Sequence, residues 1–224
     1  MNQSITVMIT TYNRNDCILE LTRELKRLKP DCTIVVVDDC SDEPIDTTYI
    51  DRFFRFPENN GKRKWWLTCR KLWRMGTTTN SDLLIQMVDD CLPNEDFFEE
   101  AVRLWKSIED RKKIALHLAN NNRKRNWTNF DRVDHSDELY LTQTTETTCI
   151  AYPDFFRQTI KVHESRWKDN PKLGSGVFAR LCQNWFNRGF TIYGVKKSLI
   201  RINPKADESQ MNKDERKINK WIVK

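Results

Sequence analysis

Two adjacent carboxylates, Asp89 and Asp90, are the residues of this 224-residue chain whose type and spacing most directly indicate chemistry. They follow the apolar run 83–88, which is short, partly β-branched and bounded by polar residues, and therefore predicts a buried strand. Pro93 has no N–H to donate, so we expect it to block continuation of that strand. Neighbouring carboxylates repel unless a cation lies beside them, and their hard oxygens suit Mg²⁺ or Mn²⁺ completed by substrate phosphates. The alternative is that both acids only cap the helix expected near Asn94–Asp96.

The elements that must position these acids alternate along the first half of the chain. A nearly all β-branched run, 32–37, predicts a second buried strand, and it too ends in paired acids, Asp38 and Asp39. Alternation of strands and helices indicates right-handed βαβ units under a parallel sheet, where ligands bind at the carboxyl ends of the strands. The expected strands are 4–10, 32–37, 52–56 and 83–88, and the expected helices are 15–28 with Asn15 or Asp16 as N-cap, 62–75 and 95–108.

The second half is less regular. Residues 120–127 form a polar, basic loop, and the chain from Pro204 onward is mostly polar. We expect one domain over 1–224, with a nucleotide-binding half at about 1–110, an acceptor-side half at about 111–203 and a polar tail at 204–224. The further expected strands are 113–118, 139–142, 149–152, 190–195 and 199–202, and the further helices are 153–162 and 171–187.

Composition narrows the class of protein. Hydrophobic residues make up 38% of the chain, which is enough for a proper core, and the 31% of charged residues are mixed in sign, which argues against disorder. The net charge of +6 permits attraction to phosphates. No apolar run approaches the roughly 20 residues of a membrane span, so we expect a soluble, cytoplasmic protein. The seven cysteines stand singly, which favours reduced thiols over a zinc site.

Four short motifs follow one another along the chain: Ile9–Arg14, Val36–Ser41, Asn59–Gly61 and Val88–Pro93, with Asn187–Tyr193 as a later helix–glycine–strand element. Their order and spacing resemble the large inverting glycosyltransferase group of the GT-A fold, over roughly residues 4–202. The resemblance implies an α/β fold with a mostly parallel central sheet, flanking helices and a smaller C-terminal acceptor-side region. The segment 207–212 and the compact size look similar, in addition, to small glycosyltransferases of tailed bacteriophages.

The resemblance also implies roles for single residues. Asp90 matches the metal ligand, for Mn²⁺ or Mg²⁺, and Asp89 matches the contact to ribose or phosphate, although Val88 stands where the family has the first acid of its triplet. Thr10 and Asp39 match the residues that hold the nucleotide base, usually uracil. An aspartate that accepts the uracil N–H would discriminate between bases. For the basic residues that follow Gly61, the alternative is a solvated helix face. The implied contacts to a UDP-sugar are Thr10, Tyr12, Arg14, Asp39, Lys62, Arg63 and Asp89.

The catalytic base is less well marked. The region that would carry it, 169–177, lacks the family's usual Glu-Asp pair, which leaves Asp169 as the first candidate, with Glu146 and Glu164 behind it. The family's late histidine is also missing from 199–203, so inversion and retention both stay open. His117, His135 and His163 stand at no ligand spacing, and we expect them to be structural or exposed.

The sequence therefore predicts a metal-dependent glycosyltransferase. Basic and aromatic residues interleave at 62–66, 70–74 and 123–127, which suits a phosphate backbone with an unstacked base. A target base within a duplex would have to be flipped outward. Together with the phage resemblance, this favours hydroxymethylated cytosine in phage DNA as acceptor, taking a sugar such as glucose or arabinose. The alternatives are a glycan, lipid-linked or protein acceptor and, in another class, a catalytically degenerate nucleic-acid-binding module.

Overall fold

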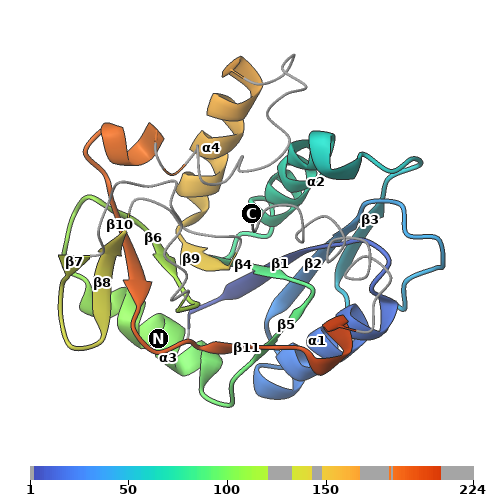
Figure 1. The fold of residues 1–224 in the computed structure, drawn as a ribbon, viewed down its shortest axis with the longest axis horizontal. Helices are drawn as coiled ribbons and strands as arrows, with labels where there is room; N and C mark the ends of the chain where they lie inside the picture. Colours follow the sequence, from blue (N-terminus) through green and yellow to red (C-terminus); the bar gives the residue numbers. More distant parts are fainter. Residues whose placement is uncertain (1–2, 121–132, 143–147, 167–181, 183, 208–224) are drawn as a thin grey trace, which may run out of the picture.

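A central sheet organises the computed structural model of the protein (Figure 1). In the described part of the chain it has nine strands, in the order β3-β2-β1-β4-β9-β6-β10-β8-β7, and only β9 and β8 run against the others. The mostly parallel α/β sheet expected from the sequence is thereby confirmed. The structure describes residues 3–120, 133–142, 148–166, 182 and 184–207. The strands are β1 Ile5–Thr11, β2 Thr33–Asp38, β3 Arg52–Arg55, β4 Leu83–Val88, β6 Lys113–His117, β7 Val133–Asp134, β8 Leu139–Thr142, β9 Cys149–Ala151 and β10 Thr191–Val195.

Helices cover both faces of the sheet. Helices α1 (Asn15–Leu28) and α3 (Phe97–Ser107) pack on one face, and α2 (Gly61–Gly76) and α4 (Pro153–Arg166) pack on the other (Figure 1). Successive side chains of a strand point to opposite faces. The strand β2 accordingly sends Ile34 and Val36 to the first face and Val35 and Val37 to the second. Burial on both faces is why residues 34–37 of this strand are all apolar.

A second, two-stranded sheet lies beside the carboxyl end of β4. It pairs β5 (Cys91–Pro93) with β11 (Ile200–Ile202), and a short 3₁₀ helix, η2 (Pro204–Asp207), follows. The chain therefore turns at Asp89 and Asp90 and re-enters a strand that Pro93 completes. The central strand ends at Val88, directly before the two acids, as expected, but Pro93 ends β5 and not the central strand.

Most expected elements lie within two or three residues of the observed ones. The N-cap prediction for α1 was wrong: Arg14 is the N-cap, and the side-chain amide of Asn15 donates to the Pro44 carbonyl at 3.1 Å. The strand β7 was not predicted. Of the helix expected at 171–187, residues 184–187 are helical and most of the rest lies outside the described residues, as do most of the loop 120–127 and of the tail. None of the helices in the described part combines the length and the apolar character that a bilayer span requires.

One buried polar contact ties the central strand to the helix above it. Trp73 of α2 donates its indole N–H to the Gln86 Oε1 of β4 at 2.7 Å, and neither side chain is exposed to solvent. In a dry core such a pair holds the helix and the strand in a fixed relation, because an unpartnered donor would lose its hydration without compensation. The same helix and strand deliver side chains to the site described next.

We predict that Gln86→Met lowers the free energy of unfolding by about 1–3 kcal/mol, because it leaves the Trp73 N–H buried without its acceptor. Urea denaturation followed by fluorescence measures this loss. The double variant Gln86→Met/Trp73→Phe removes donor and acceptor together, so its loss should be smaller than the sum of the two single losses. Strictly additive losses would show that the hydrogen bond contributes nothing.

Candidate functional site

The carboxyl ends of three adjacent parallel strands bring the candidate residues together. Strand β1 lies between β2 and β4, and its Thr10 is in register with Val37 on one side and with Val88 on the other. The residues that follow these positions therefore meet at one edge of the sheet. The backbone N–H of Asp39 donates to the Thr11 carbonyl at 2.9 Å, which extends the β1–β2 pairing into the site.

A buried arginine joins the two central acids. Arg14 Nη1 lies 2.8 Å from Asp89 Oδ1 and 3.3 Å from Asp90 Oδ2. The second oxygen of Asp89 accepts from the Thr11 hydroxyl at 2.8 Å. A cation was expected between or beside the two acids, and the guanidinium of Arg14 is such a cation. Arg14 was expected to contact the nucleotide, and its described contacts are with the carboxylates.

Burial and charge act against each other in this cluster. Burial opposes the charge of Arg14, but Asp89 and Asp90 outweigh it and raise the pKa of the guanidinium. Burial raises the pKa of the Asp89 carboxyl, although Arg14 and the Thr11 hydroxyl oppose the rise. Burial also raises the pKa of the neighbouring thiol of Cys17 to about 11, so this thiol is protonated at neutral pH.

Asp90 differs from Asp89 in being open. Its side chain is 37% exposed, whereas that of Asp89 is 9% exposed. Its backbone carbonyl accepts from Asn203 N at 2.7 Å, which fixes the turn between β4 and β5 from the β11 side. The helix-capping alternative is excluded, because β5 separates both acids from α3, whose N-cap is Asp96.

Among the described residues, Asp90 fits a divalent cation better than Asp89 does. Both oxygens of Asp89 accept buried hydrogen bonds from Thr11 and Arg14, whereas the side chain of Asp90 is 37% exposed, with its Oδ2 3.3 Å from Arg14 Nη1. Among the described residues no group of three His, Cys, Asp or Glu side chains is arranged to hold a metal ion. Mg²⁺ and Mn²⁺ often bind through one or two carboxylates and complete their coordination with substrate phosphates and water, and Asp90 suits that arrangement.

Asp39 is buried, with 5% of its surface exposed, and described residues donate to one of its two carboxylate oxygens. Its Oδ1 accepts from Asn60 N at 3.2 Å, from Asn60 Nδ2 at 2.7 Å and from the Thr68 hydroxyl at 2.9 Å. No hydrogen bond from a described residue reaches its Oδ2. The phenol of Tyr12 is close by, since burial and then the charges of Asp42 and Asp39 raise its pKa. Thr10, the second-last residue of β1, is buried at the same edge of the sheet.

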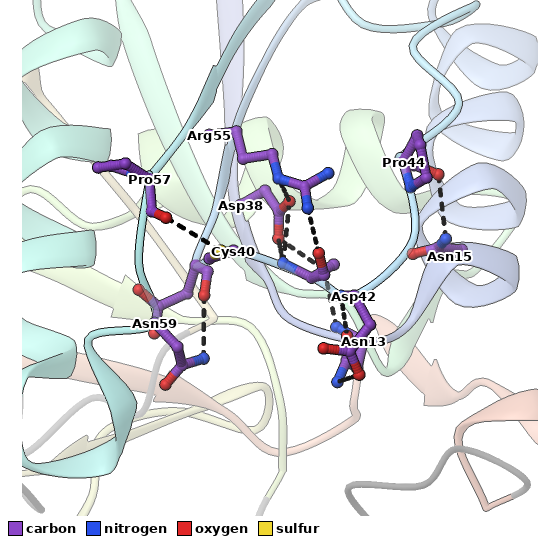
Figure 2. Close-up of polar contacts among 11 residues, drawn as sticks. Asn13, Asn15, Asp38, Cys40, Asp42, Pro44, Arg55, Pro57 and Asn59 are labelled. Atoms are coloured by element: carbon purple, nitrogen blue, oxygen red, sulfur yellow. Dashed lines mark hydrogen bonds and ion pairs between the residues drawn. The ribbon is translucent and has the colours of Figure 1, made fainter.

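Hydrogen bonds join the turn after β1 to the turn after β2 (Figure 2). Asn13 donates its backbone N–H to Ser41 Oγ at 2.8 Å and exchanges two side-chain hydrogen bonds with Asp42. Asp38 is buried and accepts from both N–H and hydroxyl of Ser41, with Arg55 Nε 3.6 Å away. Asn13 has a φ of 52° and Cys40 a φ of 67°, which mark sharp turns at the two strand ends.

Several expected site residues are not placed. Asp169 and Glu146 lie outside the described residues, and so do the side chains of Lys62, Arg63 and Glu164. Conversely, sequence reasoning missed Thr11, Asn60 and Thr68 as partners of the site acids. Asn60 belongs to the Asn59–Gly61 motif noted in the sequence, whereas no motif includes Thr68.

Two of the three tryptophans interleaved with basic residues on α2 lie in the core. Trp66 is 7% exposed and Trp73 is fully buried beneath the helix, whereas Trp65 is half-buried. Arg70 lies over the Trp66 ring at 5.1 Å, and Lys71 lies over the Phe54 ring at 3.9 Å. The prediction that Trp66 and Trp73 bind an unstacked base was therefore wrong, because the helix needs them for its own packing. The third such run, 123–127, lies outside the described residues.

Comparison with known proteins identifies the family. The family model described as glycosyl transferase family 2 matches residues 6–160. The chain belongs to this family. No curated protein matches it. The family match and the structural likeness below confirm the GT-A type of fold expected from the four motifs.

Two solved structures share the fold. The first is residues 1–349 of TarS from S. aureus, with a TM-score of 0.57 and 14% identity over 91% of this chain and 61% of that one. The second is the mannosyltransferase PcManGT from Pyrobaculum calidifontis in complex with GDP-Man and Mn²⁺, with a TM-score of 0.55 and 16% identity over 86% of this chain and 54% of that one. The present chain thus spans less than two thirds of each of these chains.

We predict that Arg14→Met lowers the free energy of unfolding at neutral pH by about 3–5 kcal/mol, because Asp89 is left as a buried, unpaired charge. The variant raises the folded-state pKa of Asp89 further above its ordinary value of 3.8. A raised folded-state pKa means that stability is lost as pH rises through it, so the deficit should shrink as pH falls toward 5.

Urea denaturation between pH 5 and pH 8 tests both statements. Arg14→Lys keeps the charge and should lose less than Arg14→Met. The exposed Arg157, which pairs with Asp154 at 2.9 Å, provides a matched control: Arg157→Met should change stability by about 1 kcal/mol or less. A deficit for Arg14→Met that grows at low pH would contradict the assignment.

Proposed function

We propose that this protein transfers a sugar from a UDP-sugar to an acceptor hydroxyl in a reaction that depends on a divalent cation. The observation that carries the proposal is the pair of carboxylates, Asp39 and Asp90, at the carboxyl ends of β2 and β4, the parallel strands on either side of β1. Asp39 keeps one oxygen that receives no hydrogen bond from a described residue, and the side chain of Asp90 is 37% exposed. This is the edge where α/β sheets bind ligands. Membership of glycosyl transferase family 2 supports the reaction class.

Asp39 supports the choice of base. An ionised carboxylate only accepts hydrogen bonds, so its Oδ2 requires an N–H donor on the ligand. The N3–H of uracil meets that requirement, whereas cytosine presents an acceptor at the same position. We propose that Thr10 and Tyr12 line the same pocket, and that Lys62 and Arg63 lie near the diphosphate. The relative from Pyrobaculum calidifontis was solved with GDP-Man, so GDP is the competitor that a test must include.

Asp90 supports the choice of cofactor. We propose that it binds Mn²⁺ or Mg²⁺ together with the donor diphosphate. When bound, such a cation neutralises the charge that develops on the leaving diphosphate. Asp89, closed by Arg14 and Thr11, contributes by holding the turn that carries Asp90 and by limiting the repulsion between the two acids. For the base that deprotonates the acceptor, Asp169 stays our first proposal and Glu146 our second.

The proposed acceptor is a hydroxyl on hydroxymethylated cytosine in phage DNA. Its support is charge, since α2 carries six Lys and Arg residues and no Asp or Glu. It draws no support from Trp66 or Trp73, which are in the core. A neutral glycan or protein acceptor would not be attracted by the positive charge of this helix. The second experiment below tests that alternative.

We predict that UDP with Mn²⁺ raises the thermal midpoint by about 5–10 °C at 100 times its Kd, which corresponds to about 2.7 kcal/mol. CDP, GDP and ADP should give smaller shifts. In Asp90→Asn the difference between UDP with and without Mn²⁺ should vanish, because the cation loses its carboxylate. The exposed Asp96 lies beyond β5, and Asp96→Asn is the matched control that should keep the full shift.

Other results would decide against parts of this proposal. A larger shift for GDP than for UDP would overturn the choice of base and leave the reaction class standing. The absence of a shift for every nucleotide, with and without metal, would overturn the transferase proposal and favour the binding-module alternative.

We predict that the protein binds duplex DNA with an affinity that falls linearly in log–log form with salt, by about 0.9 in slope per phosphate contact. The double variant Lys64→Gln/Arg74→Gln, on the exposed side of α2, should reduce that slope by about 2. Lys106→Gln/Arg111→Gln, on α3 and in the turn that follows it, removes the same charge and should leave the slope unchanged. Fluorescence anisotropy at several salt concentrations measures it, and no binding at moderate salt would favour the glycan or protein acceptor.

A further inference from the structure

Among the residues that the structure describes, three threonines are fully buried within helices, and one of them forms a different hydrogen bond. Thr22 of α1 donates its hydroxyl to the Ile18 carbonyl at 2.8 Å, and Thr159 of α4 donates to the Phe155 carbonyl at 2.6 Å. This return of the hydroxyl to the carbonyl four residues back is the usual way for a helix to satisfy it. Thr68 of α2 instead donates out of its helix, to Asp39 Oδ1 at 2.9 Å.

The bond from Thr68 completes an asymmetric environment around Asp39. Together with the two bonds from Asn60 it gives Oδ1 three donors, while no described residue donates to Oδ2. The terminal torsion of an aspartate is broad and is not fixed by rotamer preference alone. Donors gathered on one oxygen therefore select one orientation of the carboxylate and leave its other oxygen directed away from α2.

The position of Thr68 in the helix makes this contact rigid. Thr68 lies two turns after Gly61. The nearby side chains of Cys69, Leu72 and Trp73, which belong to the same helix, are buried. Trp73 in turn is fixed to Gln86 of β4. The hydroxyl is thus carried by the best-packed part of α2, whereas Asn60 lies at its first turn. A donor mounted on packed structure holds its acceptor more firmly than one at a helix end.

We propose that Thr68 is a positioning residue that sets the base selectivity of the donor site. By holding Asp39 Oδ1, it keeps Oδ2 available to an imide N–H such as N3–H of uracil. A base with an acceptor at that position, such as cytosine, then meets a carboxylate that does not rotate to relieve the repulsion. This inference rests on the proposed function, in which Asp39 is the residue that contacts the base.

The test measures the dissociation constants of UDP and CDP, with Mn²⁺, by titration calorimetry. Thr68→Val keeps the shape of the side chain and removes the hydroxyl, and the preference for UDP over CDP should fall by about tenfold, because a hydrogen bond to a charged group is lost. Thr68→Ser restores the hydroxyl and should restore the preference. Thr159→Val is the matched control, which removes an equally buried helical hydroxyl and should leave the ratio of the two constants unchanged.

Asp39→Asn separates failure of this inference from failure of the proposed function. If Asp39→Asn loses the preference for UDP while Thr68→Val keeps it, Thr68 does not position Asp39 and only the inference is overturned. If Asp39→Asn also keeps the preference, or if the wild type binds neither nucleotide, the proposed contact with the base fails and the inference fails with it.

A double-mutant cycle gives the second readout. If Thr68 acts through Asp39, adding Thr68→Val to Asp39→Asn should change the UDP to CDP ratio no further. Equal losses of affinity for both nucleotides in Thr68→Val, without rescue by Thr68→Ser, would show a purely structural role and would overturn the proposal. Urea denaturation of each variant without nucleotide establishes beforehand that it is folded.

Discussion

The buried ion pair between Arg14 and Asp89 is the constraint on which the rest of the site depends. A carboxylate removed from water is strongly unfavourable unless a cation and hydrogen-bond donors accompany it. Arg14 and Thr11 supply these from the end of β1, and Asp89 comes from the end of β4. The contact exists only while the two strands are adjacent, parallel and in register, so the chemistry of the site and the order of the sheet require each other.

The two acid pairs at the strand ends divide their roles in the same way. After β2, Asp38 is closed by Ser41 and Arg55, and Asp39 keeps one oxygen without a partner among the described residues. After β4, Asp89 is closed by Arg14 and Thr11, and Asp90 is partly exposed. The first acid of each pair is held at the strand end by these partners. In the proposed function, the second acid of each pair contacts a ligand, which is the base for Asp39 and the cation for Asp90.

Helices from opposite faces of the sheet meet at this edge. Arg14 is the N-cap of α1, which covers one face, and Asn60 is the N-cap of α2, which covers the other. Each helix therefore begins beside one of the acid pairs, and each supplies a partner for it. The apolar packing of α2, with Trp66 and Trp73 in the core, holds that helix in place. The aromatic residues of α2 thus serve the site indirectly, by fixing the helix that carries Thr68.

The sequence by itself determined the class of fold, the two acid pairs and their location. Runs of apolar and β-branched residues such as 33–37 are buried on both faces, and burial of that kind is visible in the local sequence.

Only the tertiary structure decided which acid of each pair has both oxygens bound by other residues and which does not. Asp89 meets Arg14 75 residues away, and Asp39 meets Thr68 29 residues away. Such partners depend on strand order, register and the rotation of a helix about its axis. For the same reason the interleaved tryptophans of α2 misled the sequence interpretation, since the face that a helix buries is chosen by what packs against it.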